Sequence, residues 1–107
     1  MKEQYREEID EIVKSILSAV PVSEIYLFGS FAKGEETPDS DFDFYVVIPD
    51  DSGMRELEAN WAIDGAIVGR KRDIDMIVGT QNKFNKRQNY LYSVENEVKE
   101  TGVKLHG

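Results

Sequence analysis

The sequence predicts an α+β fold, an α/β sandwich in which helices pack on a small mixed sheet, and three observations lead to this prediction. The chain has 107 residues, which is enough for one hydrophobic core but not for two, so residues 1–107 are expected to form a single domain. Helical and strand-like apolar patterns alternate along the chain. Their order is helix, strand, strand, helix, strand, helix, without a repeat or a linker.

The first half of the chain is expected to form a helix and two strands. Apolar residues recur at helical spacing from Tyr5 to Val20, and Pro21 stops this helix. The apolar run 25–28 ends at a glycine, as a short buried strand often does. A turn at 37–39 then leads into a second strand over 42–48.

The middle of the chain predicts a second helix and a third strand. Helical spacing of apolar residues from Met54 to Val68 predicts the helix, with Ser52 as its cap. The apolar face of that helix would place Trp61 in the core. Residues 73–78 predict the strand.

The C-terminal part predicts a third helix and an edge strand. Residues 83–86 are compatible with one helical turn, and residues 92–100 with a helix. One face of that helix is apolar: Leu91, Val94 and Val98. Gly102 stands at a C-cap position, and residues 103–105 fit a last edge strand.

Composition excludes several classes of protein. The chain has 13 Lys and Arg against 21 Asp and Glu, a formal charge of −8, so unaided nucleic-acid binding is not expected because phosphate backbones are gripped by basic residues. It has no cysteine, which rules out disulfides and thiolate metal sites. No apolar run resembles a signal peptide or a membrane span. We therefore expect a cytoplasmic protein that does not contact a membrane.

Aspartate recurs at every second position in the stretch GSFAKGEETPDSDFDFYVV, at Asp39, Asp41 and Asp43. A calcium-binding EF-hand loop is one explanation of this spacing. Such a loop needs glycine at its sixth position for a sharp turn. Counted from Asp39, that position is Phe44, which lies inside the expected second strand. The EF-hand explanation therefore fails.

A phosphate-binding Walker A loop is a second explanation. Gly29 and Gly34 have its glycine spacing, but the loop then requires Lys and Ser or Thr. This chain has Glu35 and Glu36 there, and these would repel phosphate. The Walker A explanation fails as well.

A metal-binding strand is the third explanation, and it agrees with all of these residues. Gly29 and Ser30 follow the first strand, where backbone N–H groups and the serine hydroxyl can hold phosphate oxygens. Asp41 and Asp43 would share one strand face about 6–7 Å apart. Two such carboxylates repel one another unless a cation lies between them, and Mg²⁺ prefers oxygen ligands of this kind.

A third acid is expected on a neighbouring strand, because two carboxylates rarely suffice to hold two metal ions. Asp75 lies inside the third apolar run, where a carboxylate is costly unless it binds something. Asp73 shares its face but stands at the start of the strand, where a solvated acid costs little. Asp75 is therefore favoured over Asp73, which remains the alternative.

These residues carry a resemblance to a known superfamily. Gly29-Ser30, then Gly34, then Ser40-Asp41-Phe42-Asp43 and the later Asp75 resemble the polymerase-beta-type nucleotidyltransferases. Within that superfamily the chain is most similar to the minimal nucleotidyltransferases, the partners of HEPN-domain proteins. The resemblance covers most of the chain. Its departures are mild: Phe42 and Tyr45 replace common aliphatic residues, and Lys33 replaces a frequent arginine.

The resemblance implies a nucleotidyltransferase-like fold and a Mg²⁺-dependent transfer reaction. It implies that Asp41, Asp43 and Asp75 are the catalytic residues and hold two Mg²⁺ ions, and that Gly29 and Ser30 cradle the phosphates of a nucleoside triphosphate. The triphosphate would be ATP, and the transferred group AMP. By the same resemblance, the acceptor is a hydroxyl on a HEPN-type toxin, which makes this chain an antitoxin and a protein adenylyltransferase.

Two other functions remain open at this point. The chain could neutralise a partner by contact alone, as a binding module with a vestigial metal site, although retaining three costly carboxylates argues against this. It could also transfer a nucleotide to a small molecule such as an antibiotic, which usually needs a further domain. The sequence fixes neither the acceptor, nor the nucleobase, nor the oligomeric state.

Two basic groups lie outside the expected catalytic set. Lys33, Arg70, Lys71 and Arg72 could steer a triphosphate, and Lys83, Lys86 and Arg87 could contact a partner or substrate. Tyr90 could stack on a base.

Overall fold

The computed structural model describes residues 2–67 and 72–107. Its helices and strands, in chain order, are α1 (Glu3–Ala19), β1 (Glu24–Phe28), α2 (Ser30–Lys33), β2 (Phe42–Ile48), α3 (Glu56–Ala66), β3 (Ile74–Thr80), α4 (Gln81–Arg87), α5 (Val94–Thr101) and β4 (Val103–His106). None of the helices in these ranges has the length and apolar character needed to cross a membrane.

The strands form one mixed sheet in the order β3-β2-β1-β4. Strand β1 runs antiparallel to both β2 and β4. Strands β2 and β3 run parallel, and α3 makes the crossover between them. The predicted α+β fold with a small mixed sheet is confirmed.

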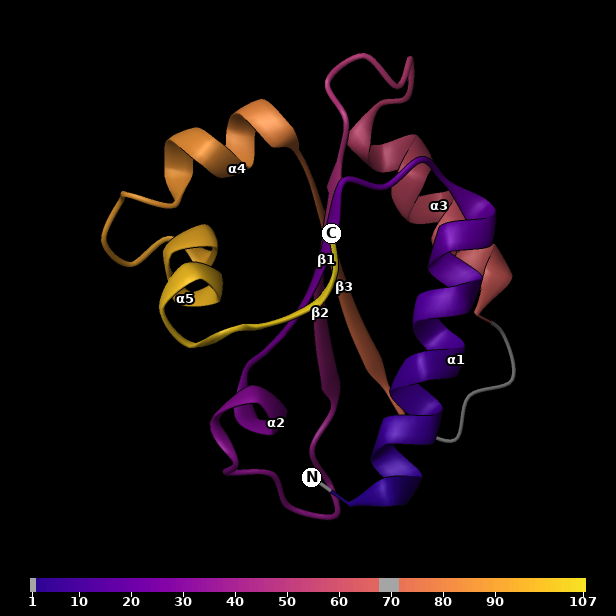
Figure 1. Ribbon diagram of the computed structural model, residues 1–107, viewed down its shortest axis with the longest axis vertical. Coiled ribbons are helices and arrows are strands. Elements are labelled where there is room, and N and C mark those ends of the chain that lie inside the picture. Colours follow the sequence, from indigo (N-terminus) through magenta and orange to yellow (C-terminus); the bar gives the residue numbers. More distant parts are fainter. Residues whose placement is uncertain (1, 68–71) are drawn as a thin grey trace.

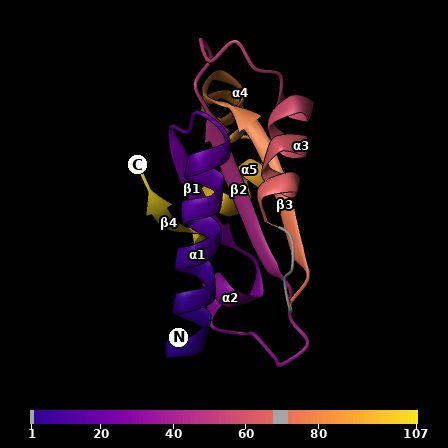
Figure 2. The ribbon, with the colours of Figure 1, turned by 90° about the vertical axis from the view of Figure 1, so that its right-hand side faces the viewer.

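Helices cover both faces of the sheet. Helices α1 and α3 lie on one face, and α4 and α5 lie on the other (Figure 1). Figure 2 shows the first of these faces, with α1 in front of the sheet and the strands following one another from β4 on the left to β3 on the right. The molecule is therefore a three-layer sandwich.

The larger core lies between the sheet and helices α1 and α3. At the end of this core where β2 begins, aromatic rings pack against one another. The ring centroids of Tyr5 and Phe31 lie 5.1 Å apart in an edge-to-face arrangement, and those of Phe31 and Phe42 lie 4.6 Å apart. Because such pairs bury large apolar areas with defined geometry, they fix the start of β2.

The smaller core lies between the sheet and helices α4 and α5. Its buried residues are Phe28, Tyr45, Val47, Phe84 and Val98. Strand β2 is therefore buried on both faces, and Asp43 is its one residue that is not fully buried. Since side chains alternate along a strand, Asp43 faces the same layer as Tyr45, the layer of α4 and α5.

Several elements differ from their predicted limits. The helix predicted from Met54 begins later, at Glu56, because Arg55 is its N-cap and the Glu58 carboxylate accepts a hydrogen bond of 3.3 Å from the Arg55 N–H. Ser52 instead closes the preceding turn, where its hydroxyl accepts from the Met54 N–H. The predicted end of that helix, Val68, lies outside the described residues. Residues 81–87 form a longer helix than the single turn expected.

Two apolar residues lie in a different environment from the one predicted. Trp61 was expected in the core but is 64% exposed, because α3 turns Ala59 and Ile63 toward the sheet. Ala59 and Ile63 are four residues apart, and so are Leu57 and Trp61. The apolar periodicity of the sequence therefore fits either face of α3. The small side chain of Ala59 allows the helix to pack closer to the sheet on its own face. Leu91 lies before α5 and is 76% exposed.

Candidate active site

The predicted site residues gather where β2 and β3 begin and β1 ends. The parallel register of β2 and β3 sets Asp43 opposite Asp75. On its other side, Asp43 is paired with Phe28, the last residue of β1, which Gly29 and Ser30 follow. The structure therefore brings together Asp43 on β2, Asp75 on β3 and Gly29, which follows β1.

Asp43 and Asp75 lie opposite each other in the parallel register of β2 and β3, and this proximity affects the pKa of Asp43. Burial is the largest cause that raises the pKa of Asp43, and the charges of Asp75, Asp41 and Glu97 add to it, so that this pKa reaches about 6. The raised pKa means that the folded protein disfavours the ionised form of Asp43.

Because Gly29 has no side chain, the Asp43 carboxylate can lie directly against it. Its φ angle is +75°, a conformation that residues with a Cβ rarely adopt. A Cβ at this position would overlap Oδ2 of Asp43 and lie 3.0 Å from its Cγ. Glycine is thus required here by both the backbone and the neighbouring carboxylate, so the first of the predicted phosphate-cradle residues adjoins the acidic pair.

Ser30, the second of these residues, begins the short helix α2. Its backbone oxygen accepts hydrogen bonds from the N–H groups of Gly34 and Glu35, the latter at 2.9 Å. The chain turns after β1 as predicted, and it then continues directly into the short helix α2. Ser30 is only partly buried, which leaves it beside Gly29 at the surface.

Asp41 lies one residue before β2 and is half-buried. It lines a cavity of about 250 Å³ together with Pro38, Asp39, Ser40, Arg72 and Asp73. The Phe42 N–H donates to the backbone oxygen of Asp73 at 3.1 Å, which continues the parallel pairing beyond β3. Asp41 therefore lies beside Asp73, whereas Asp43 lies beside Asp75. Asp75 is exposed, so the expectation that its carboxylate is enclosed in an apolar strand is wrong, and its place opposite Asp43 is what distinguishes it from Asp73.

Among residues 2–67 and 72–107, no three Asp, Glu, His or Cys side chains are grouped as the ligands of one metal ion would be. The donor chemistry nevertheless fits a hard divalent cation. All the candidate donors are carboxylate oxygens, the kind that Mg²⁺ prefers, and the pKa of Asp43 is raised first by burial and then by neighbouring carboxylates, both of which a bound cation would offset. Gly29 keeps this space clear of any Cβ.

Arg72 has a role that its sequence context did not reveal. It was grouped with Arg70 and Lys71, which lie outside the described residues, as a cation that could steer a triphosphate. Its guanidinium instead lies over the rings of Tyr5, Phe31 and Phe42, at 5.0, 5.6 and 5.4 Å from their centroids.

The same guanidinium holds the loop that leads into β2. It donates to the backbone oxygens of Pro38 and Ser40 at 3.1 and 3.0 Å. Since Ser40 directly precedes Asp41, Arg72 positions that carboxylate. No motif in the sequence signals this contact, because it joins segments that meet only in the folded sheet.

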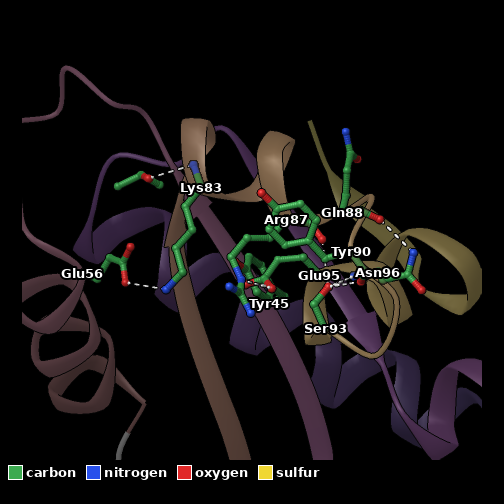
Figure 3. Close-up of polar contacts among 10 residues, drawn as sticks. Tyr45, Glu56, Lys83, Arg87, Gln88, Tyr90, Ser93, Glu95 and Asn96 are labelled. Carbon is green, nitrogen blue, oxygen red and sulfur yellow. Dashed lines mark hydrogen bonds and ion pairs between the residues drawn. The ribbon is translucent and has the colours of Figure 1, made fainter.

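A buried polar network lies under the site in the α4–α5 layer (Figure 3). The Tyr45 hydroxyl donates to Glu95 at 2.6 Å, and Arg87 Nε donates to the same carboxylate at 3.0 Å. Glu95 is only 2% exposed. Burial alone would raise the pKa of Glu95, but the hydrogen bonds from Tyr45 and Arg87 outweigh it and leave that pKa below its usual value.

Comparison with known proteins agrees with this arrangement. A family model described as "Nucleotidyltransferase domain" matches residues 6–105. No curated protein matches the chain.

Solved structures share the fold. A proposed nucleotidyltransferase from Sulfolobus solfataricus has a TM-score of 0.62 and 23% identity, over 90% of this chain and 74% of that one. A toxin-antitoxin structure with AMP-PNP has a TM-score of 0.64 and 21% identity, over 92% and 72% of the two chains. A mutant of the toxin-antitoxin MntA-HpeT has a TM-score of 0.62 and 20% identity, over the same shares, 92% and 72%.

Proposed function

Because the chain belongs to the nucleotidyltransferase domain family, we propose that it transfers AMP from ATP to a hydroxyl group on a partner protein. The observation that carries this proposal is the register that sets Asp43 opposite Asp75, next to Gly29, whose lack of a Cβ leaves room for the Asp43 carboxylate. Asp43 is partly buried and its pKa is raised, so its negative charge is disfavoured unless a cation binds nearby. The cation is proposed to be Mg²⁺.

Asp41, Asp43 and Asp75 are the proposed metal ligands and catalytic residues. When bound, two Mg²⁺ ions would offset the charge of the carboxylates and of the triphosphate and favour attack at the α-phosphorus. Gly29 and Ser30 are proposed to hold the β- and γ-phosphates. Asp75 is proposed to accept the proton of the attacking hydroxyl.

The transfer balances as a single displacement. The acceptor oxygen forms a bond to the α-phosphorus, and the bond from that phosphorus to the oxygen shared with the β-phosphorus breaks. Pyrophosphate leaves with that oxygen, and the hydroxyl proton passes to the site. The protein contributes chiefly by placing the groups and neutralising charge, as in other phosphoryl-type transfers.

The partner is proposed to be a toxin of the HEPN type, which makes this chain its antitoxin, acting in the cytoplasm. Two of the structures with the same fold are of toxin-antitoxin proteins, and one of these contains AMP-PNP. At identities of 20 and 21%, these two structures support the partner class by analogy of fold.

The decisive experiment incubates the purified chain with ATP, Mg²⁺ and the product of the adjacent gene. The intact mass of that product should increase by one or more AMP groups. The increase should require Mg²⁺ and should be absent with Asp43→Asn. An unchanged mass in the presence of all components would contradict the proposal.

A contact-only antitoxin is the second candidate, and one observation favours it. The described residues contain no ready group of three metal ligands, as expected of a vestigial site. In that case the Asp43→Asn variant would neutralise the toxin as well as the natural chain, without a change of mass. Small-molecule acceptors would give transfer without any partner protein.

A further inference from the structure

The connection between α4 and α5 exposes three large apolar residues in a row. Tyr90, Leu91 and Tyr92 are 48, 76 and 101% exposed. Tyr92 also has a φ angle of +68°, a conformation that is uncommon for a bulky residue and costs free energy. Exposure of single apolar residues is ordinary, but a consecutive set in a strained segment calls for an explanation.

This segment is held in place by hydrogen bonds, which Figure 3 shows in part. The Ser93 hydroxyl lies 2.8 Å from the backbone oxygens of both Arg87 and Tyr90. The Asn96 side chain donates to the backbone oxygen of Gln88 at 2.8 Å. The three apolar side chains are thus presented by an ordered backbone, which lowers the entropy cost of binding.

A basic cavity adjoins the segment. It has a volume of about 410 Å³ and is lined by Thr80, Asn82, Lys83, Lys86, Arg87 and Tyr90. Lys83 pairs with Glu56 at 3.2 Å and Arg87 with Glu95 at 3.0 Å. Within the described part of the chain, Lys86 makes no ion pair. The cavity therefore offers positive charge on a chain whose formal charge is −8.

We propose that the α4–α5 corner, formed by Tyr90, Leu91, Tyr92 and the basic cavity, binds an acidic segment of the partner protein that carries an apolar side chain. Tyrosine and arginine are enriched among the residues that dominate protein interfaces. Lys86, at the basic cavity, would pair with a carboxylate of the segment, and Leu91 and Tyr92 would contact its apolar side chain.

Two other occupants agree less well with the corner. Two copies of this chain related by a twofold axis would bring both basic cavities into one interface, since such an interface uses the same patch on both subunits, and the added positive charges would repel. Nucleic acid would meet the net charge of −8, which opposes binding to phosphate backbones. An acidic protein segment avoids both conflicts.

The position of the corner connects it with the candidate active site, and to that extent the inference rests on the proposed function. Arg87 contacts Glu95, which binds the Tyr45 hydroxyl. Tyr45 lies two residues beyond Asp43, about 6–7 Å along the same face of β2. A partner bound at the corner would therefore lie on the face of the sheet that carries the acidic pair.

The test measures binding of the purified product of the adjacent gene, without nucleotide, to three variants of the full chain. Leu91→Ser and Lys86→Glu alter the corner. Leu57→Ser is the matched control, because Leu57 is an apolar residue of similar exposure, 57%, on α3. Thermal unfolding confirms that each variant is folded.

We expect Leu91→Ser to weaken binding about tenfold or more, as for a central interface residue. Lys86→Glu should weaken it most at low salt, because screening reduces charge pairing, and Leu57→Ser should leave it unchanged. Equal affinities for all three would overturn the inference. So would a partner that does not bind the natural chain, or a dimer of the natural chain that Leu91→Ser dissociates.

The outcomes for this corner and for the proposed function are distinct. Binding that depends on the corner, without an increase in the partner's mass when ATP and Mg²⁺ are added, supports the inference and contradicts AMP transfer. A mass increase that is the same for Leu91→Ser and the natural chain supports transfer and overturns the inference.

Discussion

Oδ2 of Asp43 occupies the space that a Cβ at Gly29 would need. A substitution at Gly29 therefore acts on Asp43 as well as on its own backbone, whose φ angle is +75°. This relationship joins the turn after β1 to the acidic residue on β2.

Gly29→Ala should abolish nucleotide transfer, because the methyl group displaces the Asp43 carboxylate. The strained backbone should also lower stability by about 1–2 kcal/mol. Transfer is measured by mass spectrometry and stability by urea unfolding. Gly53→Ala is a matched control, because Gly53 has a φ angle of +74° but no atom within 4 Å of the point where a Cβ would lie. It should lose stability and retain transfer.

Asp43→Asn should remove transfer and leave the fold intact. In the metal-free protein the raised pKa of Asp43, about 6 against 3.8, means that ionisation opposes folding. The natural chain therefore loses stability as pH rises through this interval. The variant should be the more stable of the two above pH 6, and the difference should vanish toward pH 3.8. Urea unfolding in EDTA measures both; a variant that is less stable at neutral pH would contradict the expectation.

Asp75→Asn and Asp73→Asn should differ strongly. Asp75 lies opposite Asp43 in the register of β3 and β2, whereas Asp73 lies beside Asp41 in the neighbouring cavity. Transfer should fall by orders of magnitude with Asp75→Asn and change little with Asp73→Asn, and Mn²⁺ affinity in a direct binding assay should follow the same order. The reverse ranking would identify Asp73 as the third ligand.

Much of the sheet could be predicted from local pattern. Strand β2 has the limits expected, Phe42–Ile48, because its apolar run is buried on both faces and bounded by turns. Side-chain alternation placed Asp41 and Asp43 on one face without any knowledge of the neighbours. The identity of the metal ligands stays a prediction.

Contacts between distant segments could not be predicted in this way. The register that pairs Asp43 with Asp75 depends on how the α3 crossover returns the chain, which no local spacing encodes. Trp61 shows a second limit. Its face of α3 and the face of Ala59 have equal periodicity, and only packing against the sheet selects one.

Arg72→Ala should weaken both the fold and the site. The guanidinium packs over Tyr5, Phe31 and Phe42, so its removal should lower stability by about 1–2 kcal/mol. Loss of the hydrogen bonds to Pro38 and Ser40 should loosen Asp41 and reduce Mn²⁺ affinity. Arg72→Lys keeps the charge but not the forked donors, and should recover part of the stability without recovering metal affinity. Unchanged Mn²⁺ binding in both variants would restrict Arg72 to packing.

Glu95→Gln should destabilise the protein in a pH-dependent way. Burial opposes ionisation of Glu95, but hydrogen bonds from Tyr45 and Arg87 leave its folded-state pKa below the ordinary value of 4.5. A depressed carboxyl pKa contributes stability above the unfolded value, and this contribution is lost as pH falls through the folded one. The variant should therefore be less stable than the natural chain by about 1–3 kcal/mol at neutral pH. The difference should shrink below pH 4.5, as measured by urea unfolding across pH.

Glu100→Gln is the control, because Glu100 lies exposed on the same helix, and its substitution should leave stability unchanged throughout. A constant deficit for Glu95→Gln at all pH values would mean that its hydrogen bonds, and not its charge, stabilise the network.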